Sequence, residues 1–274
     1  MTKQKSQNKY ILVTGASRGI GFCIAKLLSE SQYTIFAGVR NVKDFNKLQQ
    51  LNKNIIPVYL DVTDDSSIKS AKEQIQKNCN NLYALINNAG ISLIEPIETV
   101  LTNDLKKQFE INAFAPIRMI QEFSPLIIKG KIINISSIAS DIELPFAAPY
   151  CASKKALEIL TNMLKEESFN NVNKIITIKA GTINTDIWNK DANKFENTQY
   201  FQIMQSVYKL MHKLSGSGQK PENLAKYILK VLESNHTKDY YYYGFDSLII
   251  KNFKILINII IKILIVMLKH QEQK

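Results

Sequence analysis

The sequence predicts an α/β fold, a doubly wound parallel sheet with helices on both faces in three layers (αβα). Apolar strand-like runs alternate with helical runs along most of the 274 residues. The first run, residues 10–14, leads directly into a glycine-rich turn and a helix. Because neither an internal repeat nor a linker interrupts this alternation, we expect one domain over residues 1–246, followed by an amphipathic C-terminal helix over 247–274.

The predicted strands are short, apolar and bounded by turn residues. Helical runs separate them, for example residues 20–30 and the stretch that ends at Lys77. A longer helical region at 98–128 contains Pro116 and Pro125, which we expect to bend or divide it. The predicted strands cover residues 10–14, 33–40, 55–61, 82–90 and 131–137, a sixth run that starts at 174, and an edge strand at 239–244.

The turn TGASRGIG, residues 14–21, has the composition of a phosphate-binding loop. Gly15 allows the tight turn, Gly19 lets the backbone approach a pyrophosphate, and Gly21 permits close helix packing. Amide groups at the start of the next helix would face the anion. A glycine-rich turn is a weak signal alone, but the strand before it and the helix after it supply the context of a dinucleotide site.

The end of the second predicted strand indicates which dinucleotide binds. An acidic residue there would bond the ribose hydroxyls of NAD. This sequence has Val39 followed by Arg40, and Arg18 lies in the glycine turn. Two guanidinium groups and no carboxylate favour a 2′-phosphate, so we expect NADP(H) rather than NAD(H). The alternative is that one or both arginines are solvated surface groups.

The segment YCASK, residues 150–154, contains a candidate acid–base pair. A helix would place Tyr150 and Lys154 on one face, where the ammonium can favour a phenolate whose ordinary pKa is about 10. Ser137 ends the run KIINISS at the predicted carboxyl edge of the sheet, where its hydroxyl could hold a substrate oxygen against Tyr150. For an isolated YxxxK, an ordinary helix pair is the alternative.

Composition excludes several other classes. The chain is 45% hydrophobic, ample for a core, and its net charge of +11 comes from scattered lysines without a basic stripe of interleaved aromatics, so we expect no nucleic-acid partner. The cysteines show no metal-ligand spacing, which predicts no metal site and reduced thiols in a cytosol-facing compartment. Residues 1–9 lack the apolar core of a secretory signal peptide. The three cysteines are Cys23, Cys79 and Cys151.

Two later segments bear on substrate access. Residues 187–220 mix aromatic and apolar residues with polar ones, and their place after the sixth strand predicts a substrate lid, with a helical surface excursion as the alternative. Residues 247–270 are apolar except for a narrow stripe of lysines. Lys262 near the middle argues against a transmembrane span. A helix lying in the membrane interface fits better, and packing on the domain or on a dimer partner is the alternative.

Together these motifs resemble the short-chain dehydrogenase/reductase family in its Asn-Ser-Tyr-Lys form. TGASRGIG, Asp61-Val62, NNAG (87–90), Asn112, the Ser137 strand, YCASK and the turn after the sixth strand occur in that family's order and spacing over residues 9–245. The resemblance implies a Rossmann-type fold and reversible hydride transfer between nicotinamide and a carbonyl or alcohol carbon. It also implies a homo-oligomer, a dimer or a tetramer.

The resemblance implies a role for each matching residue. Tyr150 would protonate the nascent alkoxide, Ser137 would hydrogen-bond the carbonyl oxygen, and Lys154 would lower the tyrosine pKa and bond the nicotinamide ribose. Asn112 would hold a water in the proton relay, although a buried mid-helix Asn taken alone would be structural. The implied cofactor-binding residues are Gly15, Ser17, Arg18, Gly19, Ile20, Gly21, Arg40, Asp61, Val62, Asn88, Ala89, Gly90, Tyr150, Lys154, Gly181 and Thr185.

One position departs from the family pattern. The family usually has Pro-Gly after the sixth strand, and this chain has Ala180-Gly181. Loss of the proline would relax a backbone that meets the nicotinamide, with an effect on rate and none on the reacting groups.

The substrate is predicted to be lipophilic. The apolar tail favours this, and the stretch from INNAGIS through TDIW is similar to the branch with hydroxysteroid and retinol dehydrogenases and lipid ketone reductases. We expect a steroid, retinoid or acyl-lipid carbonyl, and a cytoplasmic enzyme that contacts a membrane peripherally. The alternatives are a 3-oxoacyl thioester reductase and a non-catalytic NADP(H)-binding sensor or membrane scaffold, and the intact tetrad argues against the last.

Overall fold

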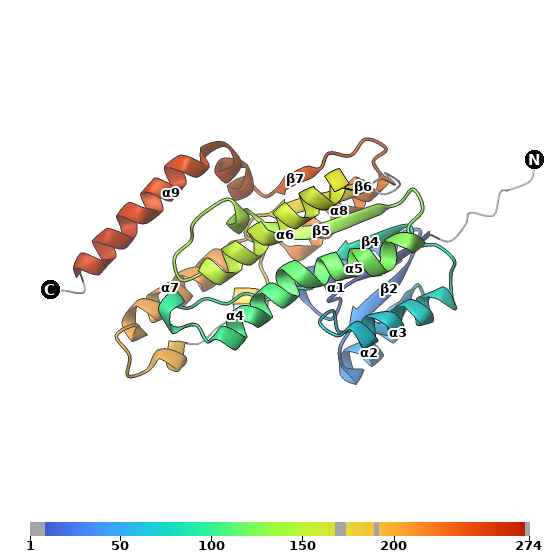
Figure 1. Ribbon diagram of the computed structural model, residues 1–274, viewed down its shortest axis with the longest axis horizontal. Coiled ribbons are helices and arrows are strands. Elements are labelled where there is room, and N and C mark those ends of the chain that lie inside the picture. The colour runs from blue at the N-terminus through green and yellow to red at the C-terminus, as the bar shows by residue number, and fades with distance from the viewer. Residues whose placement is uncertain (1–8, 168–173, 189–191, 272–274) are drawn as a thin grey trace, which may run out of the picture.

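The computed structural model describes residues 9–167, 174–188 and 192–271, with the side chains of the last helix described as far as Ile261 and at Ile263. One sheet of seven strands runs through it in the order β3-β2-β1-β4-β5-β6-β7, and every pair is parallel (Figure 1). The predicted doubly wound parallel sheet is confirmed. The strands are β1 (Lys9–Val13), β2 (Tyr33–Val39), β3 (Ile55–Tyr59), β4 (Ala84–Asn87), β5 (Lys131–Ser137), β6 (Lys174–Ala180) and β7 (Tyr240–Tyr243).

Helices cover both faces of the sheet and enclose two apolar cores. Helices α1, α2 and α8 pack on one face, and α3, α5 and α6 pack on the other. Buried Val, Ile, Leu and Ala from the strands fill both layers, as expected for parallel strands that contact helices on both sides. The main helices are α1 (Gly19–Ser29), α2 (Val42–Gln49), α3 (Asp65–Gln76), α4 (Thr102–Phe109), α5 (Ala115–Phe123), α6 (Ala148–Glu167), α7 (Phe201–Gly216), α8 (Pro221–Glu233) and α9 (Phe245–Gln271).

The strand order reverses direction beside β1. From β1 the chain moves outward to β2 and β3, then returns to place β4 on the other side of β1. Such a switch point leaves a crevice outside the carboxyl ends of the two central strands. The loops after β1 and β4, which carry the glycine turn and NNAG, therefore meet at one edge of the sheet.

The predicted helical region at 98–128 is divided at two places. Helix α4 passes through a π-helical turn, η2 (Glu110–Phe114), into α5. Pro116 lies in the first turn of α5, which continues directly from η2, and Pro125 lies in a short 3-10 turn, η3 (Ser124–Leu126), after α5 has ended. The expected division is therefore confirmed at Pro125, and a second one falls at the π-helical turn around Asn112, just before Pro116.

The predicted lid is mostly helical. Helix α7 buries Met204 and Tyr208, which pack with Phe195 in a cluster that includes Tyr150. Residues 189–191 of the predicted lid lie outside the described residues. Opening and closing of this segment stays a prediction.

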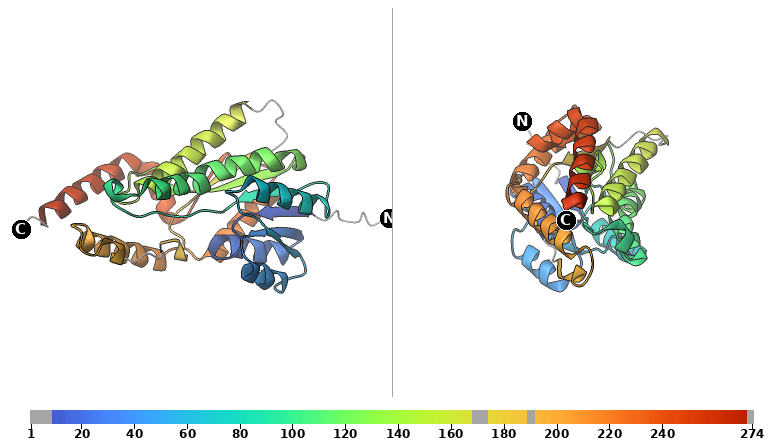
Figure 2. Two further views of the ribbon diagram at one scale, coloured as in Figure 1. Left: turned by 60° about the horizontal axis from the view of Figure 1, so that its bottom comes forward. Right: turned by 90° about the vertical axis from the view of Figure 1, so that its left-hand side faces the viewer.

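The C-terminal helix α9 projects beyond the carboxyl edge of the sheet, on the same side as α7 (Figure 2). It is kinked at Phe253, whose φ and ψ are −126° and 22°. Polar contacts tie it to the body at two places: Asp246 Oδ2 accepts from the amide of Thr182 at 2.6 Å, and Asn258 Oδ1 accepts from the amide of Glu143 at 2.9 Å. Among the described residues, no helix is long and apolar enough to cross a membrane.

Candidate active site

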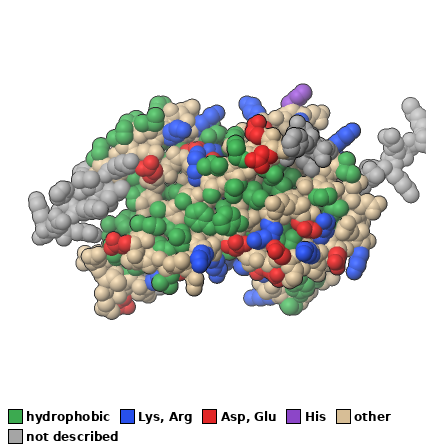
Figure 3. All heavy atoms as spheres, viewed as in Figure 1, with side chains coloured by type: hydrophobic (Ala, Val, Ile, Leu, Met, Phe, Trp, Pro, Cys, Tyr) green, Lys and Arg blue, Asp and Glu red, His purple; other side chains and the backbone are tan. Residues whose placement is uncertain are grey.

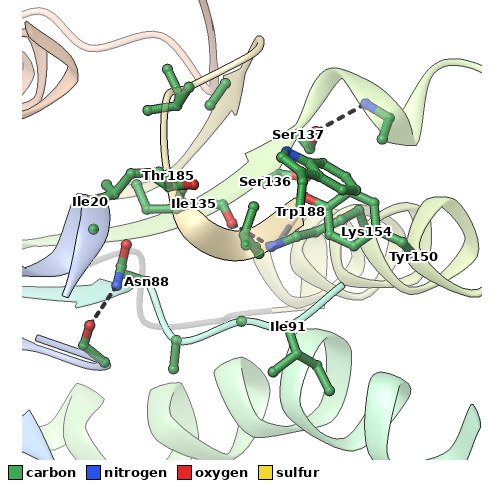
Figure 4. Close-up of a pocket in the computed structure, with 18 of the residues that line it drawn as sticks. Ile20, Asn88, Ile91, Ile135, Ser136, Ser137, Tyr150, Lys154, Thr185 and Trp188 are labelled. Carbon is green, nitrogen blue, oxygen red and sulfur yellow. Dashed lines mark hydrogen bonds between the residues drawn. The ribbon is translucent and has the colours of Figure 1, made fainter. Parts of the chain in front are cut away.

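A cleft of about 480 Å³ lies along the carboxyl edge of the sheet. The loops after β1, β2, β3 and β4 line one half of it, and β5, α6, the turn after β6, α7 and α9 line the other. Figure 4 shows Ile20 and Asn88 at one end and Ser137, Tyr150, Lys154 and Trp188 gathered at the other. The sheet thus brings segments more than 100 residues apart in sequence into one cavity.

Close backbone contacts hold the glycine turn. Gly15 has a φ of +64°, and a Cβ there would lie 2.9 Å from the Cα of Ala89. At Gly21 a Cβ would lie 2.3 Å from the carbonyl oxygen of Gly15 and 2.4 Å from Nδ2 of Asn88. Both positions therefore require glycine, Gly15 for the turn and Gly21 for helix packing.

Asn88 and Thr14 lock the glycine turn to the NNAG loop. Asn88 Nδ2 donates to the carbonyl oxygens of Thr14 and Gly15, at 3.0 and 3.1 Å. The Thr14 hydroxyl oxygen accepts from the amides of Asn88 and Ala89, at 3.0 Å each. Asn88 thus stabilises the conformation of the glycine turn. Thr14 does so as well, and it was not among the predicted site residues.

These features fit a nicotinamide dinucleotide. Gly15 and Gly19 line the cleft with positive φ values and no side chain, and the first turn of α1 carries no acidic residue that would repel a pyrophosphate. Bound there, such a cofactor would donate or accept a hydride, and the chain's own residues would bind and orient it.

Arg18 and Arg40 line the end of the cleft away from Tyr150, and both side chains are solvent-exposed. Asp61 also lines it, but its Oδ1 accepts from the amide and hydroxyl of Thr63, at 2.9 and 2.7 Å. This carboxylate follows β3, whereas the residue that follows β2 is Arg40. The end of β2 therefore carries a cation.

At the reacting end, Ser137 and Tyr150 face the same cavity from β5 and α6. The Ser137 hydroxyl oxygen accepts from the amide of Ala139 at 3.1 Å, which fixes it at the start of a 3-10 turn, η4 (Ile138–Ser140). Tyr150 is 5% exposed. Two hydroxyls therefore lie where a substrate oxygen could accept from both.

Burial controls the ionisation of the acid–base pair. It raises the pKa of Tyr150 to about 12, while a hydrogen bond to Ser137 opposes this rise. Burial also lowers the pKa of Lys154 to about 8, opposed by the negative charge of Glu158. At neutral pH the tyrosine is a phenol that can donate a proton, and the lysine is mostly charged.

Lys154 lies within reach of both the phenol and the strand. Its Nζ is 6.0 Å from the centroid of the Tyr150 ring and donates to the carbonyl oxygen of Ile135 at 2.9 Å. The main influences on the phenol are burial and Ser137, so the expected lowering of its pKa by Lys154 stays a prediction.

Asn112 is fully buried in the π-helical turn and does not line the cleft. Its Oδ1 accepts from the amide of Ile91 at 2.9 Å, and its Nδ2 donates to the Ile91 carbonyl oxygen at 2.8 Å and to Ser153 Oγ at 3.1 Å. The side chain thus ties the loop after NNAG to α6. A role in holding water stays a prediction.

The turn after β6 is held without the missing proline. The amide of Gly181 donates to the Tyr243 carbonyl oxygen at 2.7 Å, and Asp246 Oδ2 accepts from the amide of Thr182 at 2.6 Å. A Cβ at Gly181 would lie 2.0 Å from Oδ1 of Asp246, so a larger residue here would displace that side chain. The relaxed backbone suggested by Ala180 is therefore secured by the first turn of α9, which the sequence analysis missed.

Trp188 packs its ring edge-on against Tyr150, with the ring centroids 5.1 Å apart (Figure 4). Trp188 was not among the predicted site residues. Its being the chain's single tryptophan was the one sequence feature that could have indicated it. Two of the predicted residues, Gly21 and Asn112, do not line the cleft and act through packing and hydrogen bonds instead. The predicted residues that line it are Gly15, Ser17, Arg18, Gly19, Ile20, Arg40, Asp61, Val62, Asn88, Ala89, Gly90, Ser137, Tyr150, Lys154, Gly181 and Thr185.

Comparison with known proteins agrees with this arrangement. Residues 9–196 match the short chain dehydrogenase family. The chain is 31% identical over 231 residues to an NADPH-dependent 3-dehydrocapnine reductase of Ornithobacterium rhinotracheale, covering 79% of this chain and 81% of the relative. It is 30% identical over 233 residues to a 3-ketodihydrosphingosine reductase of Bacteroides thetaiotaomicron, covering 82% and 84%.

The solved structures agree on the fold. A short-chain dehydrogenase from Streptomyces avermitilis superposes with a TM-score of 0.77 at 24% identity, over 89% of this chain and 90% of that one. The chain therefore belongs to the short chain dehydrogenase family, and it is an oxidoreductase.

Proposed function

We propose that this protein is an NADP(H)-dependent oxidoreductase that interconverts a lipophilic ketone or aldehyde and its alcohol, with Tyr150 as the general acid and base. The observation that carries the proposal is the apolar character of the cleft beyond Tyr150. Residues from four segments supply it, and among the lining residues only Asp186 and Asp246 bring carboxylates to that end. The apolar lining residues are Ile138, Ala139, Ile142, Leu144, Ile187, Trp188, Leu210, Met211, Leu214 and Ile250.

Two observations support NADP(H). Arg18 and Arg40 line the end of the cleft away from Tyr150, where the adenosine of the cofactor would lie and its 2′-phosphate could accept from a guanidinium. The Ornithobacterium relative is named as NADPH-dependent. Among the lining residues at the end of β2, no carboxylate stands beside Arg40 to bond the ribose hydroxyls of NAD.

The proposed proton path uses the two hydroxyls at the reacting end. Ser137 would donate a hydrogen bond to the carbonyl oxygen, and the phenol of Tyr150 would give that oxygen its proton as the alkoxide forms. The raised pKa of Tyr150 favours this direction, because a neutral phenol is the form that donates. The Lys154 ammonium would stabilise the phenolate that this transfer leaves on Tyr150, and it would bond the nicotinamide ribose.

The substrate class is proposed to be a steroid, retinoid or acyl-lipid carbonyl. The Bacteroides relative is named for the ketone of a sphingoid base, which agrees with an acyl-lipid ketone. Helix α7 contributes Leu210, Met211 and Leu214 to the cleft, and α9 contributes Ile250. A long alkyl chain could therefore leave the reacting end between these two helices.

The test is NADPH oxidation, followed by nicotinamide absorbance, with ketones of increasing chain length and ring count and NADH in parallel. We expect kcat/KM to rise with apolar size and to favour NADPH. Faster turnover of small polar ketones would contradict the substrate class. Tight NADPH binding with no turnover across the panel would favour a binding protein instead.

We also propose that α9 contacts a membrane surface peripherally. Most of its described exposed side chains are apolar, with Phe245 77% and Ile255 72% exposed. Lys251 and Lys254 are exposed on the same helix and suit anionic headgroups. Since α7 also exposes Leu210 and Leu214 beside the cleft, a lipid surface would meet the substrate end directly.

A homo-oligomer and a reducing compartment complete the proposal. Figure 3 shows hydrophobic side chains gathered over the face that α4, α5 and α6 form, where Phe114, Ile159 and Met163 are exposed. A second copy of the chain would cover this face. All three cysteines are unpaired, as in a reducing cytoplasm. Light scattering at several concentrations would give the mass, and a monomer throughout would contradict the oligomer.

A further inference from the structure

Three ionic side chains are buried together behind the strand that carries Ser137. They are Asp141, just after η4, Glu158 on α6 and Lys179 on β6. Lys179 Nζ lies 2.8 Å from Asp141 Oδ1 and 2.9 Å from Glu158 Oε2. All three side chains are at most 8% exposed, so water screens their charges weakly.

Glu158 also fixes the backbone on both sides of Ser137. Its Oε1 accepts from the hydroxyl of Ser136 at 3.0 Å and is in hydrogen-bond contact with the hydroxyl of Ser140. Ser140 Oγ is in turn 2.7 Å from the carbonyl oxygen of Ser137. One carboxylate therefore binds the residue before the active-site serine and the turn after it.

The position of Glu158 relative to Lys154 adds an electrostatic effect. The two residues are four apart on α6, one helical turn, and Glu158 acts against the lowering of the Lys154 pKa by burial. The other polar groups near this carboxylate are Lys179 on β6 and the phenol of Tyr240 on β7. Asp141 after η4 shares Lys179 with it and accepts from the phenol of Tyr242. With Lys154 included, two cations balance two anions.

Stability alone does not account for such a network. Replacing a buried ion pair by apolar residues is often neutral or stabilising, because desolvation offsets the attraction of the charges. Here each partner touches an element of the reacting end: η4 lines the cleft, β5 ends at Ser137, and α6 carries Tyr150 and Lys154.

We propose that Glu158, held by Lys179, is a positioning residue of the active site that fixes the Ser137 turn against α6 and supplies the counter-charge for the Lys154 ammonium. The proposal rests on the roles proposed above for Ser137 and Lys154. Its test therefore includes a measurement that needs no turnover.

The measurement is an NMR titration of the Lys154 side chain in isotope-labelled protein with NADP⁺ bound, with the Lys154 signal assigned through Lys154→Arg. In Glu158→Gln the carboxylate is lost and the isosteric amide can still contact both serines. We expect the pH midpoint of the Lys154 titration to fall by about one pH unit, because an opposite charge one helical turn away shifts a pKa by that order. The pH above which kcat/KM declines should fall with it.

A second variant is expected to shift the Lys154 titration midpoint in the opposite direction. In Lys179→Met/Asp141→Asn the ion pair is replaced by neutral groups, and Glu158 keeps its charge with Lys154 as its nearest cation. We expect the Lys154 midpoint to rise, and this variant also tests the proposal if Glu158→Gln does not fold. As a matched control, Glu122→Gln breaks the 2.8 Å pair with Lys72 between α3 and α5 and should leave the midpoint unchanged.

Opposite shifts in the two variants support the proposal. Shifts of the same sign, or an unmoved midpoint with activity lost only in proportion to thermal stability, would show that the network is merely structural. If no ketone in the panel is reduced, the titration still decides this point, and the failure then concerns the proposed function and not the network.

Discussion

The Nζ of Lys154 donates a 2.9 Å hydrogen bond to the carbonyl oxygen of Ile135, two residues before the serine that ends β5. This contact joins α6 to the strand and keeps the ammonium inside the protein at 6% exposure. A buried ammonium is costly, and the lowered pKa of Lys154 expresses that cost.

Lys154→Met should therefore stabilise the fold while removing turnover. The pKa of Lys154 falls from 10.5 to about 8 on folding, so the protonated lysine disfavours the folded state by about 3 kcal/mol at neutral pH. Loss of the hydrogen bond to Ile135 offsets part of this, which leaves an expected gain of about 1 to 3 kcal/mol.

The sign of the pH dependence follows from the direction of this pKa shift. The penalty is complete below pH 8 and disappears as the pH rises through 10.5, where the unfolded lysine also loses its proton. Urea unfolding of both proteins should show a difference at pH 7 that shrinks by pH 10. A variant less stable than wild type at pH 7 would contradict the prediction.

Tyr150→Phe should abolish turnover and retain cofactor binding. The variant keeps the ring that packs on Trp188 and loses only the hydroxyl that would protonate the substrate oxygen. We expect kcat to fall by about 10² to 10⁴, the usual contribution of a general acid. NADPH fluorescence titration should give an affinity within a few-fold of wild type. Retained turnover would remove Tyr150 from the proposed role.

Arg40→Ala should weaken NADPH binding more than NADH binding. A charge-assisted hydrogen bond is worth about 1.5 to 3 kcal/mol, so we expect the preference for NADPH to fall by about 10- to 100-fold. Lys43→Gln removes one nearby positive charge at an exposed residue that does not line the cleft, and it controls for long-range attraction. Equal losses in the two variants, or equal effects on the two cofactors, would show that Arg40 does not contact a 2′-phosphate.

The sequence predicted the parts of the molecule that local pattern determines. Strand and helix periodicity predicts the parallel sheet, and a parallel sheet necessarily brings the ends of its strands to one edge. That rule places Gly15, Asn88 and Ser137 around one cleft, and α6, which follows β5 in the chain, adds Tyr150.

Contacts between distant segments were not predictable in this way. Lys179 and Asp141 are 38 residues apart, and only the pairing of β5 with β6 brings them together. The π-helical turn at Asn112 ends two residues before Pro116, and the proline alone does not specify that the helix is interrupted by a π-helical turn. Asp246 fits against Gly181 because the edge strand β7 returns the chain to that place.

The exposed apolar side of α9 leads to the final prediction, on membrane binding. Ile255→Ser/Leu256→Ser/Ile259→Ser removes three side chains that are each more than half exposed. Each buried Ile or Leu contributes about 1.5 to 3 kcal/mol, so even partial insertion should make the triple variant float with liposomes at least about tenfold less than wild type. Leu51→Ser/Ile128→Ser removes exposed apolar residues elsewhere and should float normally. If the triple variant floats as wild type does, α9 is not the membrane contact, and its apolar side is then better explained by packing against a second copy of the chain.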